Sequence, residues 1–114
     1  MRKIAMAMTA LSLAVGTGIA AAPGAVAATT CPSGAVCIRE FGGDILSKNI
    51  FYSYGAHNLD NVTGYHILAN SQTGGAGFEL CRGYNGTDCS ITYRTTGDYP
   101  SIDFTPINSI LLVP

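Results

Sequence analysis

Short runs of alternating apolar and polar residues recur along the chain after residue 34. This period of two, together with many β-branched and aromatic residues, predicts strands rather than helices. Six strands are expected, at Ala35–Glu40, Asn49–Tyr54, Val62–Ala69, Gly77–Cys81, Ser90–Arg94 and Ile107–Val113. Turn-forming residues separate them, at Gly42-Gly43-Asp44, Ser71–Gly75, Asn85-Gly86 and Gly97-Asp98. The pattern therefore predicts an all-β domain, either a two-sheet sandwich or a small barrel.

Two motifs in the first half of this pattern are echoed in the second half. Glu40–Asp44 is echoed 43 positions later by Gly83–Thr87, and both segments contain an aromatic-x-Gly sequence. Asn61–Tyr65 is echoed 45 positions later by Pro106–Ile110, where a small polar pair opens an apolar strand. Two units of this size could not each bury an apolar sheet face alone, so we expect them to pack together as a sandwich.

The beginning of the chain has the pattern of a secretion signal. Arg2-Lys3 precedes an apolar stretch from Ile4 to Ala22, and Ala25-Val26-Ala27 supplies the small residues of a cleavage site. We expect residues 1–27 to be removed, with cleavage after Ala28 as an alternative, which leaves a single domain at residues 28–114. A membrane anchor is the rival interpretation, but the stretch is rich in Ala and interrupted by Gly. The mature protein is then expected to be extracellular and not membrane-bound.

The charge of the chain narrows the range of partners. The 114 residues carry a formal net charge of −1, and only 11% of them are charged. Removal of Arg2 and Lys3 with the signal leaves four basic and seven acidic residues, a net charge of −3. Phosphate binding needs clustered Lys and Arg, so we do not expect a nucleic-acid partner.

The four cysteines all follow the expected cleavage site. An even number in a small exported domain predicts two disulfides, for which three pairings exist. Cys31 and Cys37 lie equally far from Gly34, and Cys81 and Cys89 lie equally far from Asn85. If each centre is the middle of a short hairpin loop, local pairing follows.

An alternative exists for the second pair of cysteines. A two-residue turn at Asn85-Gly86 would place Cys81 opposite Ser90 and not opposite Cys89. A zinc site is disfavoured, because neither Cys-x5-Cys nor Cys-x7-Cys is a zinc spacing.

The two echoed motifs resemble those of the βγ-crystallin superfamily, whose units carry an aromatic-x-Gly hairpin followed by a small polar pair. The segments Cys31–Cys37, directly after a signal, and Pro106–Val113 resemble the start and end of a narrower group. This group is the small actinobacterial secreted proteins classed with the Streptomyces metalloproteinase inhibitor. The resemblance implies a disulfide-braced two-sheet β-sandwich of βγ-crystallin type, built from two Greek-key-like repeats.

The functional hypothesis is a secreted inhibitor of extracellular peptidases, with metallopeptidases as a possible class. A cystine-braced loop loses little entropy when it binds and can occupy an active site. The candidate loop is Arg82–Asp88, in which Arg82, Gly83, Tyr84 and Asn85 form the first part, and a second candidate is the edge at Cys37-Ile38. The expected partner is an extracellular peptidase, and the domain is expected to be a monomer.

The alternative hypothesis is a non-enzymatic binding module for calcium, a cell-wall glycan or a cell-surface target, as in killer-toxin-like proteins. Calcium prefers six to eight oxygen ligands. Only Asp60 and Asp103 are candidate carboxylates, and Leu59, Phe104 and Gly64 stand where the family loop offers oxygen donors. We therefore favour metal-free turns and expect no cofactor.

No residue pattern predicts catalysis. His57 and His66 are the only histidines, Glu40 and Glu79 have no identified partner, and no nucleophile motif is present. We expect no enzymatic activity.

Two expectations concern tyrosines. Tyr52 and Tyr54 share a predicted strand face with Ile50 and are candidates for the core. Tyr84 is expected either to pack over Gly86 or to be exposed as part of a binding surface.

Overall fold

The computed structural model describes residues 27–114, and the expected signal peptide lies outside the described residues except for Ala27. The strands are β1 Ala27–Ala28, β2 Val36–Arg39, β3 Ile45–Phe51, β4 Gly55–Asn58, β5 Tyr65–Asn70, β6 Gly77–Cys81, β7 Gly97–Asp103 and β8 Ser109–Val113. A 3-10 turn, η2 Tyr84–Gly86, lies between β6 and β7, and the described residues contain no α-helix. A helix that could cross a membrane is accordingly not found in this part of the chain. The all-β prediction is confirmed.

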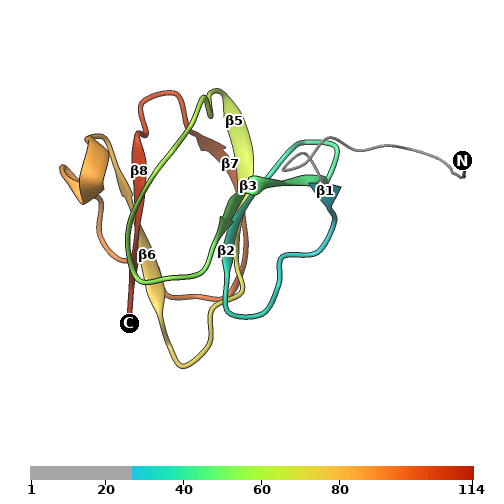
Figure 1. The fold of residues 1–114 in the computed structure, drawn as a ribbon, viewed down its shortest axis with the longest axis horizontal. Coiled ribbons are helices and arrows are strands. Elements are labelled where there is room, and N and C mark those ends of the chain that lie inside the picture. Colours follow the sequence, from blue (N-terminus) through green and yellow to red (C-terminus); the bar gives the residue numbers. More distant parts are fainter. Residues whose placement is uncertain (1–26) are drawn as a thin grey trace, which may run out of the picture.

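The strands form two antiparallel sheets that face each other (Figure 1). The first sheet has the order β1-β3-β2-β5-β7, and the second has the order β4-β8-β6. Apolar side chains from both sheets fill the space between them, since alternate residues of each strand point to the same face. The buried members of this core are Val36, Ile38, Phe51, Val62, Leu68, Phe78, Phe104, Ile110 and Leu112.

The pairing registers relate the two halves of the chain. In the first sheet β2 pairs with β5 from Val36↔Asn70 onward, and in the second sheet β6 pairs with β8 from Phe78↔Leu112 onward. A shift of 42 positions converts the first pair into the second, and the remaining three pairs of each ladder are related in the same way. The central ladder of each sheet is therefore built by one half of the chain.

Each half also gives one strand to the sheet of the other half. β4, from the first half, pairs with β8 at Gly55↔Leu112, and β7, from the second half, pairs with β5 at Gly97↔Asn70. The same shift of 42 positions relates these pairs, and both glycines have a positive φ, 106° and 118°. The exchange of β4 and β7 makes each sheet depend on both halves.

The two sequence echoes have different outcomes. The hairpin echo is confirmed at its spacing of 43, because the bond from the Glu40 amide to the Asp44 carbonyl has its equivalent between Gly83 and Thr87. The second echo, at a spacing of 45, does not match the registers. Ser109 pairs with Cys81 as Ile67 pairs with Arg39, so Ser109 is equivalent to Ile67 and not to Gly64.

Five of the six predicted strands overlap an observed strand, and Ser90–Arg94 does not. This segment forms no continuous ladder with β6. It contacts β6 through the isolated bridge Phe78↔Tyr93 and through separate hydrogen bonds, such as the one from the Ser90 amide to the Leu80 carbonyl. β4 was not predicted, and β7 begins at Gly97-Asp98, where a turn was expected. β7 is an edge strand whose side chains are mostly exposed, so it lacks the apolar alternation that marks a buried strand.

The expectation that Tyr52 and Tyr54 belong to the core is wrong. β3 begins at Ile45 and ends at Phe51, so both tyrosines follow the strand, and they are 58% and 57% exposed. The strand and its alternation of buried and exposed side chains end at Phe51. There the chain leaves the first sheet to form β4 in the second.

A second, smaller core lies on the other face of the first sheet. Val36 and Ile38 point into the sandwich, so the intervening Cys37 points outward, where its disulfide to Cys31 packs with Ile45 and others. The members of this small core are Cys31, Ala35, Cys37, Ile45 and Ala69. The first predicted disulfide pair is thus confirmed, and it fixes residues 31–35 across the sheet.

Phe78 tests the importance of the packing between the two sheets. Its fully buried ring, on β6, packs against Tyr93 and against Tyr99 of β7 with centroid distances of 5.5 and 5.1 Å. We expect Phe78→Ala to lower the free energy of unfolding by about 3–5 kcal/mol in urea denaturation. Ile91→Ala is the control, because Ile91 is 73% exposed, and its effect should stay within about 0.5 kcal/mol. Equal effects of the two substitutions would contradict this description of the core.

Candidate functional site

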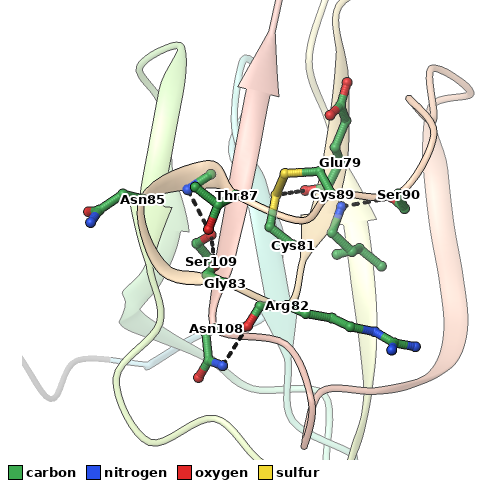
Figure 2. The surroundings of a disulfide bond; sticks show 12 residues. Glu79, Cys81, Arg82, Gly83, Asn85, Thr87, Cys89, Ser90, Asn108 and Ser109 are labelled. Carbon is green, nitrogen blue, oxygen red and sulfur yellow. Dashed lines mark hydrogen bonds between the residues drawn. A yellow bond between two sulfur atoms is a disulfide. The ribbon is translucent and has the colours of Figure 1, made fainter.

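The hairpin between β6 and the following segment is closed by the second disulfide, Cys81–Cys89 (Figure 2). The two Cα atoms are 3.9 Å apart, and the cysteines form an antiparallel bridge. Beyond them the Arg82 amide donates to the Asp88 carbonyl at 2.9 Å. The predicted symmetry about Asn85 is therefore confirmed, and the alternative that placed Cys81 opposite Ser90 is wrong.

The tip of the hairpin is a tight turn and not an extended segment. The Gly83 amide donates to the Thr87 carbonyl at 3.0 Å, so Tyr84–Gly86 form a three-residue loop with 3-10 geometry. Asn85 has a φ of 59° in the left-handed region, which asparagine tolerates better than most residues. The Thr87 hydroxyl donates to the Tyr84 carbonyl at 2.8 Å and closes the turn further.

Polar side chains of β4 and β8 fix this tip to the second sheet. The Asn85 amide N–H donates to the Asn58 side-chain oxygen at 2.7 Å, and the Asn58 side chain donates back to that of Asn85 at 3.0 Å. The buried Ser109 hydroxyl accepts from the Gly86 amide at 3.0 Å and donates to the Gly83 carbonyl at 2.6 Å. The tip is held by both halves of the chain, because Asn58 belongs to the exchanged strand.

The base of the hairpin has further anchors. The Asn108 side chain donates to the Arg82 carbonyl at 2.6 Å, and its backbone amide donates to the Cys81 carbonyl at 2.9 Å. Gly86 lies so close to the sheet that an added Cβ would be 3.1 Å from the Ala56 Cβ. Its φ of 72° also favours glycine, so the position has both a conformational and a steric requirement for this residue.

The outer surface of the hairpin presents side chains to solvent. Arg82, Tyr84, Asn85, Thr87 and Asp88 are exposed, and Tyr84 is 57% exposed. Figure 2 shows the Arg82 side chain extending away from the hairpin. Of the two interpretations of Tyr84, the structure favours the exposed one. The disulfide, the short ladder and the bonds to β4 and β8 thus hold a small exposed surface in one conformation.

Cys37 and Ile38, the second candidate inhibitory site, are not at an edge. Both are 0% exposed, and β2 lies between β3 and β5 in the interior of the first sheet. A partner could not reach either side chain in the folded domain. Alternation alone did not distinguish an edge strand from a central one.

The two calcium candidates are exposed, Asp60 in the loop after β4 and Asp103 as the last residue of β7. The Asp103 carboxylate accepts from the Thr105 amide at 3.0 Å, as expected for a turn that satisfies its own backbone. The Asp60 carbonyl accepts from the Lys48 ammonium at 2.5 Å. No group of three metal-ligating side chains occurs within residues 27–114.

The histidines and glutamates have separate surroundings. His57 lies on β4, where a ring nitrogen is 2.7 Å from the Ser53 carbonyl. His66 lies on β5, 3.6 Å from the Glu40 carboxylate, whereas Glu79 accepts a hydrogen bond from the Thr92 hydroxyl at 2.6 Å. The structure does not bring the two glutamates together with a shared partner among the described residues.

Some residues that hold the hairpin could be found in the sequence and others could not. Asn108 and Ser109 form the small polar pair that the echo identified, although its role as an anchor of the hairpin was not predicted. Asn58 had no sequence signal, because its partner Asn85 is 27 positions away and the two meet only through the exchange of β4. Comparison with known protein families, curated proteins and solved structures finds no match to this chain.

Ser109 provides a test of how the hairpin is fixed. Ser109→Ala removes a buried hydroxyl that makes two hydrogen bonds to the hairpin and leaves the Gly86 amide without a partner, so we expect a loss of about 1–3 kcal/mol. Amide hydrogen exchange at Gly83 and Gly86 should accelerate. Ser53→Ala is the control, because Ser53 is exposed, and it should change neither quantity. Unchanged exchange in Ser109→Ala would show that the hairpin is held by other contacts.

Proposed function

We propose that this chain is a secreted βγ-crystallin-type domain that inhibits extracellular peptidases through the hairpin between Cys81 and Cys89. Support for the family comes from the topology. Each half contributes a hairpin with an aromatic-x-Gly tip, two paired central strands and one strand exchanged into the opposite sheet. These features support the Greek-key arrangement that the sequence resemblance implies.

Secretion is supported by two independent features. The leader pattern of residues 1–27 ends in a small-residue cleavage site, and all four cysteines after it are paired in disulfides. Disulfides persist in extracellular proteins and are rare where thiols are kept reduced. The domain would therefore act outside the cell.

The observation that carries the inhibitory function is the locked hairpin. An inhibitor gains affinity when its binding loop is already ordered, because little conformational entropy is then lost on binding. The disulfide at the base and the Asn58 and Ser109 contacts at the tip supply this order. The exposed Tyr84 and Arg82 side chains are of the types that dominate the binding energy of protein interfaces.

The shape of the hairpin determines how it would block a peptidase. Substrates lie extended in a peptidase cleft, whereas the tip of this hairpin is a 3-10 turn with Asn85 in the left-handed region. The hairpin backbone therefore does not imitate a substrate. The hairpin would block the active-site cleft by inserting the Tyr84 or Arg82 side chain. It would resist cleavage because no peptide bond at its tip lies in an extended segment.

A titration of residues 28–114 against a thermolysin-type metallopeptidase and a subtilisin-type serine peptidase tests this function. We expect a stoichiometric end point with one of the two. Tyr84→Ala should raise the inhibition constant by about 30-fold or more, as expected for a central interface residue. The matched control is Tyr54→Ala, because Tyr54 is equally exposed but lies outside the hairpin, and it should change the constant by less than about twofold. Residual activity that is unaffected by micromolar protein would overturn the proposal, as would equal effects of the two substitutions.

A further inference from the structure

A concave region lies away from the Cys81–Cys89 hairpin, on the first sheet. It is a polar pocket of about 330 Å³ formed by the β2–β3 hairpin, β3, the loop before β5 and the start of β5. This volume falls in the lower part of the range of small-molecule sites. Its lining residues are Glu40, Leu46, Lys48, Asn49, Asn61, Val62, Thr63 and His66.

Asn49 is the unusual residue of this pocket. It is only 2% exposed, and the described residues provide no hydrogen-bond partner for its side-chain amide. Its amide nitrogen and oxygen are nevertheless not completely buried, and they account for part of the small accessible area of this residue. A buried amide without partners costs free energy unless a ligand or water satisfies it. Asn49 therefore presents one donor group and one acceptor to whatever occupies the pocket.

The other polar side chains extend this mixture of donors and acceptors. The Glu40 carboxylate accepts hydrogen bonds, and the Lys48 ammonium, which is 2.5 Å from the Asp60 carbonyl, donates them. Their opposite charges leave the lining without a strong preference for an anion or a cation. The His66 ring is already engaged, with its nitrogens 2.8 Å from the Thr63 carbonyl and 3.3 Å from the Arg39 carbonyl, and it fixes one wall.

An aromatic ring lies beside this wall. Phe41, at the tip of the β2–β3 hairpin, is 66% exposed, and its ring is stacked on His66 with the centroids 6.4 Å apart. An exposed phenylalanine next to a polar pocket offers an apolar surface on which the C–H face of a ring-shaped polar ligand can pack.

We propose that this pocket binds a neutral saccharide. Sugar hydroxyls both donate and accept hydrogen bonds, so one sugar ring can satisfy the Asn49 amide, the Glu40 carboxylate and the Lys48 ammonium together. An inorganic anion could use only the donors, and a simple cation only the acceptors. The site is independent of the proposed inhibitory hairpin, so either function can fail without the other.

A titration of ¹⁵N-labelled residues 28–114 with glucose and with N-acetylglucosamine tests the proposal. We expect saturable amide shifts, with a dissociation constant in the millimolar range, confined to residues 40–41, 46–49 and 61–66. Sodium sulfate and the open-chain polyol sorbitol serve as control ligands and should not give saturable shifts there. Saturation by neither sugar, or the same shifts with sorbitol, would overturn the proposal and leave a water-filled pocket.

Two substitutions sharpen the test. Glu40→Gln should weaken saccharide binding by about tenfold, because hydrogen bonds to a charged group are replaced by weaker ones. Glu79→Gln is its matched control, since Glu79 is also a partly exposed glutamate but lies outside the pocket, and it should leave binding unchanged. Asn49→Ala should abolish the amide shifts if the variant folds. If this variant does not fold, the saccharide affinity of Glu40→Gln tests the site. Equal binding by the two glutamine variants would contradict the assigned site.

Discussion

The exchange of one strand between the two halves of the chain is the constraint on which the rest of the structure depends. Each half builds the central ladder of one sheet and gives one strand, β4 or β7, to the other sheet. A half on its own would expose one apolar face and one unpaired strand, and the 88 described residues leave little other surface to bury. The core at Phe78 and Phe104 exists only when both halves are present.

The candidate hairpin follows from the same constraint. The segment that follows the hairpin contacts β6 through isolated bridges and separate hydrogen bonds and not through a continuous ladder, so the Cys81–Cys89 disulfide reinforces the base of the hairpin. Its tip then rests on β4, which comes from the first half, and on Ser109 of β8. The rigidity on which the proposed inhibitory function relies is therefore a property of the assembled sandwich and not of the hairpin sequence alone.

The sequence predicted those features whose cause is local. Strands β2, β5, β6 and β8 carry side chains of the buried core, so the alternation of apolar and polar residues was sufficient to predict them. Both cysteine pairs are symmetric about a turn residue, so their spacing was sufficient to predict the disulfides. β7 was missed because an exposed edge strand that contains Gly97 and Pro100 shows no apolar alternation, and β4 is too short to show any. Asn58 was missed for a different reason. Its role depends on the exchange of β4, which brings it beside Asn85, and no local pattern records that.

Dividing the chain between Thr73 and Gly74, in the turn that connects the halves, tests this dependence most directly. Residues 28–73 and 74–114 would be produced separately and compared by amide NMR spectra, alone and as an equimolar mixture. We predict that each fragment alone gives the poorly dispersed spectrum of an unfolded chain, and that mixing restores the dispersed spectrum of the intact domain. A dispersed spectrum with cooperative unfolding from either fragment alone would contradict it, because that half would then bury its own sheet face without the exchanged strand.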